Sequence, residues 1–220
     1  MRKVTTVGTL LLALCSTSLA AQLEPCDNAD LGPGAECGTI RVLEDRSDPD
    51  GRAIDLETVV LRARKPDGRA PLFLLAGGPG QAASDLAGLA LGPWAAVLEV
   101  RDIVLVDQRG TGGSNKLDCP VDAAGAPASV FGGLFDPDAY RACLDSMSAH
   151  ADPRLYGSFE VVADHEEVRS ALGDDKASLW GGSGGTRTAL VWLKEYPASI
   201  EAALLDGVTP TWFRSPTAFA

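Results

Sequence analysis

Hydrophobic and polar residues alternate along the first part of the chain. Residues 39–43 and 54–61 change character at every second position, which is typical of strands with one buried face. Asp48-Pro49-Asp50-Gly51 lies between them and has the residue types of a tight turn. This segment is therefore predicted to be an antiparallel hairpin.

The pattern then changes to short, fully apolar runs separated by stretches with helical spacing. The predicted strands are residues 71–75, 103–106, 177–180 and 202–206. The predicted helices are residues 85–97, 159–172 and 186–196. Strands that alternate with helices predict an α/β fold with a mainly parallel sheet, here preceded by the antiparallel hairpin. Residues 115–156 are rich in Ala, Gly, Pro and Asp and are interpreted as an excursion from this pattern.

The N-terminus has the three parts of an export signal. Arg2 and Lys3 form a basic region, residues 7–14 an apolar region, and Ser18-Leu19-Ala20 a small-residue cleavage site. The apolar run is too short to span a bilayer, so a membrane anchor is not expected. Residues 1–21 are predicted to be a signal peptide, and residues 22–220 the exported part, secreted or periplasmic.

Removal of this segment leaves four cysteines in an oxidising compartment: Cys26, Cys37, Cys119 and Cys143. Four cysteines allow three pairings. Local pairs, Cys26 with Cys37 and Cys119 with Cys143, are favoured because each brackets a loop-rich stretch. A zinc site is disfavoured since no C-x-x-C spacing is present, and neither a metal nor an organic cofactor is predicted.

The 220-residue chain has a formal net charge of −11 and is 45% hydrophobic. This hydrophobic content is normal for a globular core. The acidic balance disfavours nucleic acid and anionic membranes as partners. Nothing in the sequence predicts an oligomeric state.

The candidate chemistry centres on Gly181-Gly182-Ser183-Gly184-Gly185, between a predicted strand and a predicted helix. Strand, G-x-S-x-G turn and helix form the sequence signature of a nucleophile elbow, which exposes a serine hydroxyl at the edge of a sheet. The flanking glycines let two backbones pass closely. Ser183 is therefore the candidate nucleophile.

Two further glycine-rich loops follow predicted strands. Gly77-Gly78-Pro79-Gly80 is the candidate for half of an oxyanion hole, with the backbone N–H of Gly184 as the other half. The loop at residues 107–114 does not match a phosphate-binding motif. Asp107 and Arg109 in this loop are interpreted as a structural pair or network, and Asp107 is not the expected catalytic acid.

Four segments together resemble a known family. They are A-G-G-P-G at 76–80, D-I-V-L-V-D-Q-R-G-T-G-G-S at 102–114, W-G-G-S-G-G-T-R at 180–187 and L-L-D-G-V at 204–208. Their order and spacing are similar to exported α/β-hydrolases of the proline iminopeptidase and tripeptidyl aminopeptidase group. The resemblance implies a serine peptidase that acts on peptides with a free N-terminus, with Ser183 as nucleophile and Gly184, Gly77 and Gly78 at the oxyanion hole.

The sequence departs from this family at two points. The residue after the nucleophile is usually aromatic, and here it is Gly184. In addition, the triad of this fold runs Ser, then acid, then His, whereas no histidine follows Ser183. His150 and His165 both precede it. The lid, the last strands, the acid and the histidine are thus expected beyond Ala220, and the given chain is interpreted as the N-terminal portion of a longer enzyme, inactive alone.

Two alternatives stay open. An esterase-type acyl hydrolase would use the same elbow, since the elbow does not identify the leaving atom. A non-catalytic exported binding protein could keep the scaffold without the base.

Overall fold

A computed structural model describes residues 21–118 and 137–213 of the chain. Its strands are β1 (Glu24–Pro25), β2 (Ala35–Leu43), β3 (Ala53–Leu61), β4 (Leu72–Leu75), β5 (Ile103–Val106), β6 (Ala177–Gly182) and β7 (Ile200–Asp206). Its α-helices are α1 (Ala87–Leu91), α2 (Ala95–Leu98), α3 (Pro137–Ser148), α4 (Ser158–Ala171) and α5 (Gly184–Glu195). Short 3₁₀ turns cover Ala29–Leu31, Ser84–Leu86, Pro153–Leu155 and Pro197–Ser199.

The strands form one seven-stranded sheet in the order β1-β2-β3-β5-β4-β6-β7. The predicted hairpin is present as β2 and β3, which pair antiparallel over their whole length. β5, β4, β6 and β7 run parallel to one another, and β5 pairs antiparallel with β3. The sheet is therefore mixed and mostly parallel in its second half, which confirms the predicted α/β fold class.

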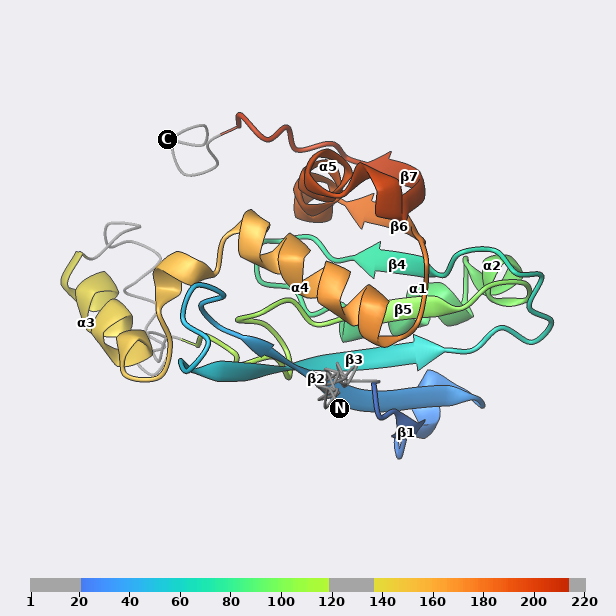
Figure 1. Cartoon of the computed structure of the whole chain (residues 1–220), viewed down its shortest axis with the longest axis horizontal. Coiled ribbons are helices and arrows are strands. Elements are labelled where there is room, and N and C mark those ends of the chain that lie inside the picture. The colour runs from blue at the N-terminus through green and yellow to red at the C-terminus, as the bar shows by residue number, and fades with distance from the viewer. Residues whose placement is uncertain (1–20, 119–136, 214–220) are drawn as a thin grey trace, which may run out of the picture.

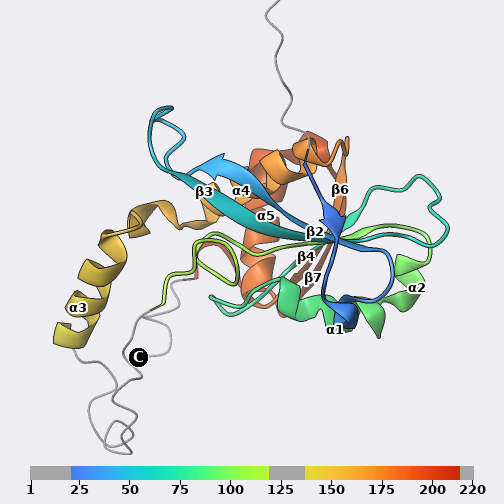
Figure 2. The same cartoon turned by 90° about the horizontal axis from the view of Figure 1, so that it is seen from below.

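Helices cover both faces of the sheet, as Figures 1 and 2 show. α4 and α5 lie on one face, and α1 and α2 lie on the other. Because side chains alternate along a strand, β4 serves both layers. Phe73 and Leu75 pack toward α4 and α5, whereas Leu72 and Leu74 pack toward α1 and α2.

Two predicted elements differ from the structure. The helix expected at residues 85–97 is a 3₁₀ turn followed by two short helices, α1 and α2. Gly92 and Pro93 lie between these helices, and proline has no N–H to continue the helical hydrogen bonds. The excursion at 115–156 contains α3, which the sequence reading did not predict, and which lies to one side of the sheet (Figure 1).

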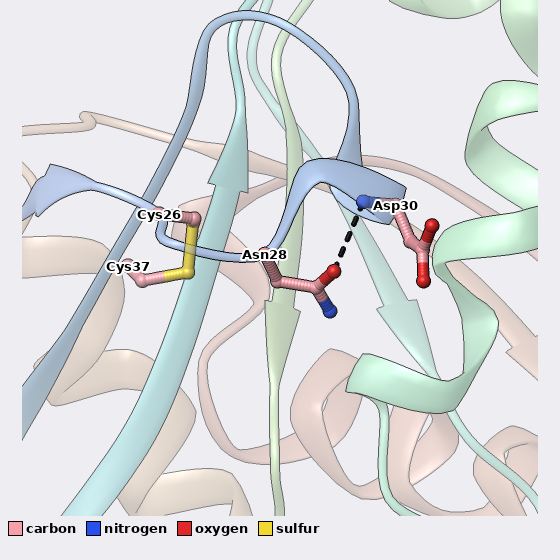
Figure 3. The surroundings of a disulfide bond; sticks show 4 residues. All are labelled: Cys26, Asn28, Asp30 and Cys37. Carbon is pink, nitrogen blue, oxygen red and sulfur yellow. Dashed lines mark hydrogen bonds between the residues drawn. A yellow bond between two sulfur atoms is a disulfide. The ribbon is translucent and has the colours of Figure 1, made fainter.

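The disulfide between Cys26 and Cys37, one of the two local pairs favoured by the sequence, is present. It joins the end of β1 to β2 (Figure 3). In the segment between the two cysteines, Asp30 donates its backbone N–H to the Asn28 side chain at 2.9 Å. Cys143 is buried and disulfide-bonded. Its predicted partner, Cys119, lies outside the described residues, as do residues 1–20 of the predicted signal peptide.

The parallel strands bring their carboxyl ends to one edge of the sheet. Leu75 at the end of β4 is in register with Gly181 of β6, and Gly182 at the end of β6 is in register with Asp206 of β7. Open α/β sheets bind ligands beyond this edge. The glycine-rich loop after β4 and the elbow after β6 both begin there.

Candidate active site

Ser183 occupies the sharp turn between β6 and α5. Its backbone has φ 50° and ψ −115°, a conformation that residues other than glycine rarely adopt. The Ser183 N–H donates to the carbonyl of Asp206 at 2.7 Å. Its carbonyl accepts from the hydroxyl and the N–H of Thr186 at 2.5 and 3.1 Å. These contacts hold the turn, and the residue is solvent-exposed at the edge of the sheet.

The glycines on either side of Ser183 let α5 approach the sheet. A Cβ at Gly185 would lie 2.0 Å from the carbonyl oxygen of Leu75 in β4. A Cβ at Gly181 would lie 2.7 Å from the carbonyl oxygen of Gly185. Neither distance is possible for real atoms, so backbone occupies the space that side chains would need. The close passage of backbones predicted for this motif is present.

The loop after β4 lies directly against the elbow. A Cβ at Gly77 would be 3.2 Å from the Ser183 Cβ, and a Cβ at Gly184 would be 3.2 Å from the carbonyl oxygen of Gly78. The three residues predicted for an oxyanion hole are thus brought together around Ser183. A side chain at position 184 would therefore make a tight contact with this loop.

Two cavities meet at Ser183, and Gly77 and Gly78 line both. The first has a volume of about 290 Å³, and the second about 420 Å³. The first is lined by Ala76, Gly77, Gly78, Pro79, Gln108, Tyr156, Ser158, Val161, Ser183, Gly184, Arg187, Thr188, Thr209 and Phe213. The second is lined by Gly77, Gly78, Gln81, Leu86, Trp180, Gly182, Ser183, Asp206 and Gly207. A substrate can therefore extend from Ser183 in two directions.

The charged residues around Ser183 are divided between these cavities. Arg187 is the one charged residue that lines the first cavity, and Asp206 is the one that lines the second, among the residues that the structure describes. Asp206 is part of this wall, and its backbone carbonyl holds Ser183 in place.

Neither histidine lines these cavities. His165 lies within the core, where its ring packs against those of Phe73 and Trp192. Its Nδ1 is 2.7 Å from the carbonyl oxygen of Val161, so Nδ1 carries the hydrogen, since a carbonyl only accepts. Burial lowers the pKa of His165 and keeps the ring neutral. His150 is exposed just after α3.

Asp107 and Arg109 were predicted to form a structural pair or network; they do not bond to each other, and each takes part in a hydrogen-bond network of its own. Buried Asp107 accepts from the N–H and hydroxyl of Ser84 at 2.8 and 3.1 Å, and from the N–H of Gly113 at 3.0 Å. A Cβ at Gly112 would lie 1.9 Å from the Asp107 carboxylate. Asp107 therefore joins its own loop to the turn at Ser84–Leu86.

Arg109 instead forms a buried ion pair with Asp164 of α4. Two nitrogens of its guanidinium donate to the two carboxylate oxygens at 2.6 and 2.7 Å. Further bonds reach the carbonyls of Leu43, Glu44 and Leu155. Arg46 donates to the same carboxylate at 2.6 Å. The sequence reading missed Asp164, because the two partners are 55 residues apart.

This network also positions Tyr156, which lines the first cavity. The Tyr156 hydroxyl donates to the buried Glu44 carboxylate at 3.0 Å and accepts from the Asn115 amide at 2.6 Å. The Arg109 guanidinium stacks 5.7 Å from its ring centre. Burial raises the pKa of Tyr156 to about 12, and the Glu44 carboxylate acts in the same direction. Tyr156 is therefore a fixed, neutral hydrogen-bonding wall of the cavity.

Within residues 21–118 and 137–213, no three His, Cys, Asp or Glu side chains gather as they would around a metal ion. In the same part of the chain, no helix has the length and apolar character needed to cross a bilayer.

Comparison with known proteins places this site in a wider context. The sequence is 29% identical over 203 residues to the serine protease Hip1 of Mycobacterium tuberculosis, covering 79% of this chain and 36% of that protein. It is 28% identical over 143 residues to proline iminopeptidase of Neisseria gonorrhoeae, covering 65% of this chain and 34% of that protein. The chain thus spans about a third of the length of these relatives.

Two solved structures share the fold. One, a Salmonella enterica protein named for acyltransferase activity, has a TM-score of 0.52 at 21% identity and covers 86% of this chain and 46% of that one. The other, a Pseudomonas aeruginosa protein named for epoxide hydrolase activity, has a TM-score of 0.50 at 22% identity and covers 85% and 47%. The family described as alpha/beta hydrolase fold matches residues 70–219, which contain β4, β5, the elbow and both cavities. The chain belongs to the alpha/beta hydrolase fold family.

Proposed function

We propose that this protein is the Ser183-bearing part of an exported serine peptidase that acts at the N-terminus of peptides. The observation that carries the proposal is the geometry of Ser183: an exposed serine on a strained turn, bordered by two cavities. Strained backbone of this kind is concentrated at functional sites. The names of the relatives, serine protease and proline iminopeptidase, support peptide rather than ester substrates.

In the proposed reaction the Ser183 Oγ attacks the carbonyl carbon of the scissile amide, and its proton passes to a base. The negative charge that develops on the carbonyl oxygen is stabilised by the N–H of Gly184 and an N–H of the Gly77–Gly78 loop. The amine leaves with the proton returned by the base, and an acyl-enzyme remains. A water molecule, deprotonated by the same base, then releases the acyl group and restores Ser183.

Among the residues that the structure describes, no histidine base lies at the site. His165 is held in the core and His150 lies beside α3, so neither accepts the Ser183 proton. The proposal therefore requires a histidine and its orienting acid from outside residues 1–220. A non-catalytic binding protein is the second candidate, because a serine without a base is a weak nucleophile.

Export forms part of the same proposal. The basic, apolar and small-residue regions of residues 1–21 support it, and so does the Cys26–Cys37 disulfide, since disulfides persist in oxidising compartments.

Active-site labelling tests the nucleophile directly. The 220-residue protein is treated with a fluorophosphonate, with and without added imidazole as an external base, and the modified residue is located by mass spectrometry. We expect modification at Ser183, accelerated by imidazole on the order of tenfold because the missing base is replaced. No peptidase turnover is expected without added imidazole.

The matched variants separate site chemistry from surface reactivity. Ser183→Ala should remove the label, whereas Ser170→Ala, an exposed serine of α4, should leave it unchanged. Absence of modification at Ser183 with or without imidazole would exclude the nucleophile and favour the binding protein. Comparing matched amide and ester substrates then distinguishes a peptidase from an esterase.

A further inference from the structure

Arg187 stands out among the arginines that the structure describes. Each of the others forms an ion pair with a carboxylate, and Arg187 forms none. The hydrogen bond given for its guanidinium runs from Nη2 to the carbonyl oxygen of Thr211 at 2.5 Å. A guanidinium has five N–H donors, so most of its hydrogen-bonding capacity is unused by described residues.

The position of Arg187 brings this cation to the candidate active site. It lies four residues after Ser183, one turn along α5, so both residues are on the same side of the helix. Arg187 is half-buried and lines the first cavity. Arg187 therefore contributes a positive charge to the wall of the space beside the candidate nucleophile.

The rest of this cavity is suited to an anion. No Asp or Glu side chain is among its described lining residues. The polar side chains that accompany Arg187 are neutral: Gln108, Tyr156, Ser158, Ser183, Thr188 and Thr209. The N-terminal end of α5, with its positive partial charge, opens on the same space. In a protein of net charge −11, such a cavity is a local exception.

We propose that Arg187 is a specificity-determining residue that binds a carboxylate of the substrate in the first cavity. A planar guanidinium matches a carboxylate with two parallel hydrogen bonds. The cavity of about 290 Å³ is at the small end of ligand sites, so it fits a short peptide segment rather than a folded chain. The carboxylate belongs either to the C-terminus of a short peptide or to an acidic side chain.

This inference rests on the proposed function only in taking the cavity beside Ser183 as a substrate site. Binding can therefore be measured apart from catalysis. The experiment uses the 220-residue protein with Ser183→Ala, which prevents cleavage, and isothermal titration calorimetry. The probes are trialanine, its C-terminal amide, and Ala-Asp-Ala amide with Ala-Asn-Ala amide as its uncharged partner.

We expect one carboxylate-bearing probe to bind on the order of tenfold more tightly than its uncharged partner, as charge-assisted hydrogen bonds allow. A preference for trialanine over its amide identifies the C-terminal carboxylate, and a preference for Ala-Asp-Ala amide identifies the side chain. Arg187→Gln should abolish the preference while keeping a donor for the Thr211 carbonyl. Arg187→Lys should keep part of it. Arg41→Gln removes an equal charge from the exposed face of β2 and should leave the preference intact.

Equal binding of charged and uncharged probes, no binding of any probe, or a preference that survives in Arg187→Gln would overturn the inference. Circular dichroism of each variant checks that it is folded. If Arg187→Gln is unfolded, the binding preference of Arg187→Lys tests the inference instead. Fluorophosphonate labelling reports separately on Ser183. A carboxylate preference without labelling keeps the Arg187 site and removes the nucleophile, and labelling without the preference does the reverse.

Discussion

At the residue level, two neighbouring glycines of the elbow differ in the space available for a side chain. Gly185 has no room for a side chain, because the Leu75 carbonyl of β4 lies where its Cβ would be. Gly184 faces the loop after β4, where the carbonyl of exposed Gly78 would have to move by only a few tenths of an ångström to admit a Cβ. The two positions therefore differ in what they tolerate.

We predict that Gly185→Ala lowers the free energy of unfolding by about 3 kcal/mol, because α5 must separate from β4 to admit the methyl group. Gly184→Ala should change it by less than about 1 kcal/mol, since the strain at Gly78 is offset by the better helix propensity of alanine. Urea denaturation followed by circular dichroism measures both. Equal stability of the two variants would contradict the packing described at β4.

At the scale of elements, the buried ion pair between Arg109 and Asp164 joins three segments. Arg109 follows β5, Asp164 belongs to α4, and the carbonyls of Leu43 and Glu44 end β2. The side chains of Arg109 and Asp164 are 0% and 2% exposed. Through Glu44 and Tyr156 the same cluster fixes one wall of the first cavity.

We expect Asp164→Asn to lower the free energy of unfolding by about 3–5 kcal/mol, because it leaves the Arg109 charge buried without a counter-charge. Glu167 carries the other carboxylate bound by Arg46, and its side chain is 46% exposed. Glu167→Gln should therefore lower the free energy of unfolding by less than about 0.5 kcal/mol. Denaturant unfolding of both variants gives the comparison. Similar losses in the two would show that the buried pair carries no special weight.

At the scale of the whole molecule, the disulfide fixes the N-terminal edge of the sheet. Strand β1 has two residues and contributes little pairing of its own. The Cys26–Cys37 bond closes a loop with a sequence separation of 11 and ties this segment to β2. Its contribution follows from the entropy removed from the unfolded chain.

The double variant Cys26→Ser/Cys37→Ser is predicted to lose about 3 kcal/mol of stability under oxidising conditions. Thermal unfolding with and without reductant measures this. The wild-type protein should be destabilised by reductant more than the variant, in which only the disulfide of Cys143 remains to be reduced. A reductant effect of the same size in both proteins would mean that the disulfide of Cys143, and not Cys26–Cys37, provides the stabilisation.

The elements that depend on local pattern can be predicted from the sequence. The four apolar runs became β4, β5, β6 and β7, and the alternating residues became the β2–β3 hairpin. The glycine-rich turn at Ser183 became an elbow between β6 and α5. The loop at residues 77–80 could be placed beside Ser183, because parallel strands bring their carboxyl ends to one edge. Period and turn chemistry are properties of short segments, so they can be read directly.

Contacts between residues that are distant in the sequence depend on how the elements pack. Insertion of β5 between β3 and β4 placed Arg109 over α4, where it pairs with Asp164 instead of the nearby Asp107. Packing of α4 turned His165 into the core, away from Ser183. The passage of α5 beside the first cavity left Arg187 in its wall without a carboxylate. These outcomes depend on which faces are buried against each other, and residue spacing along one chain does not contain that information.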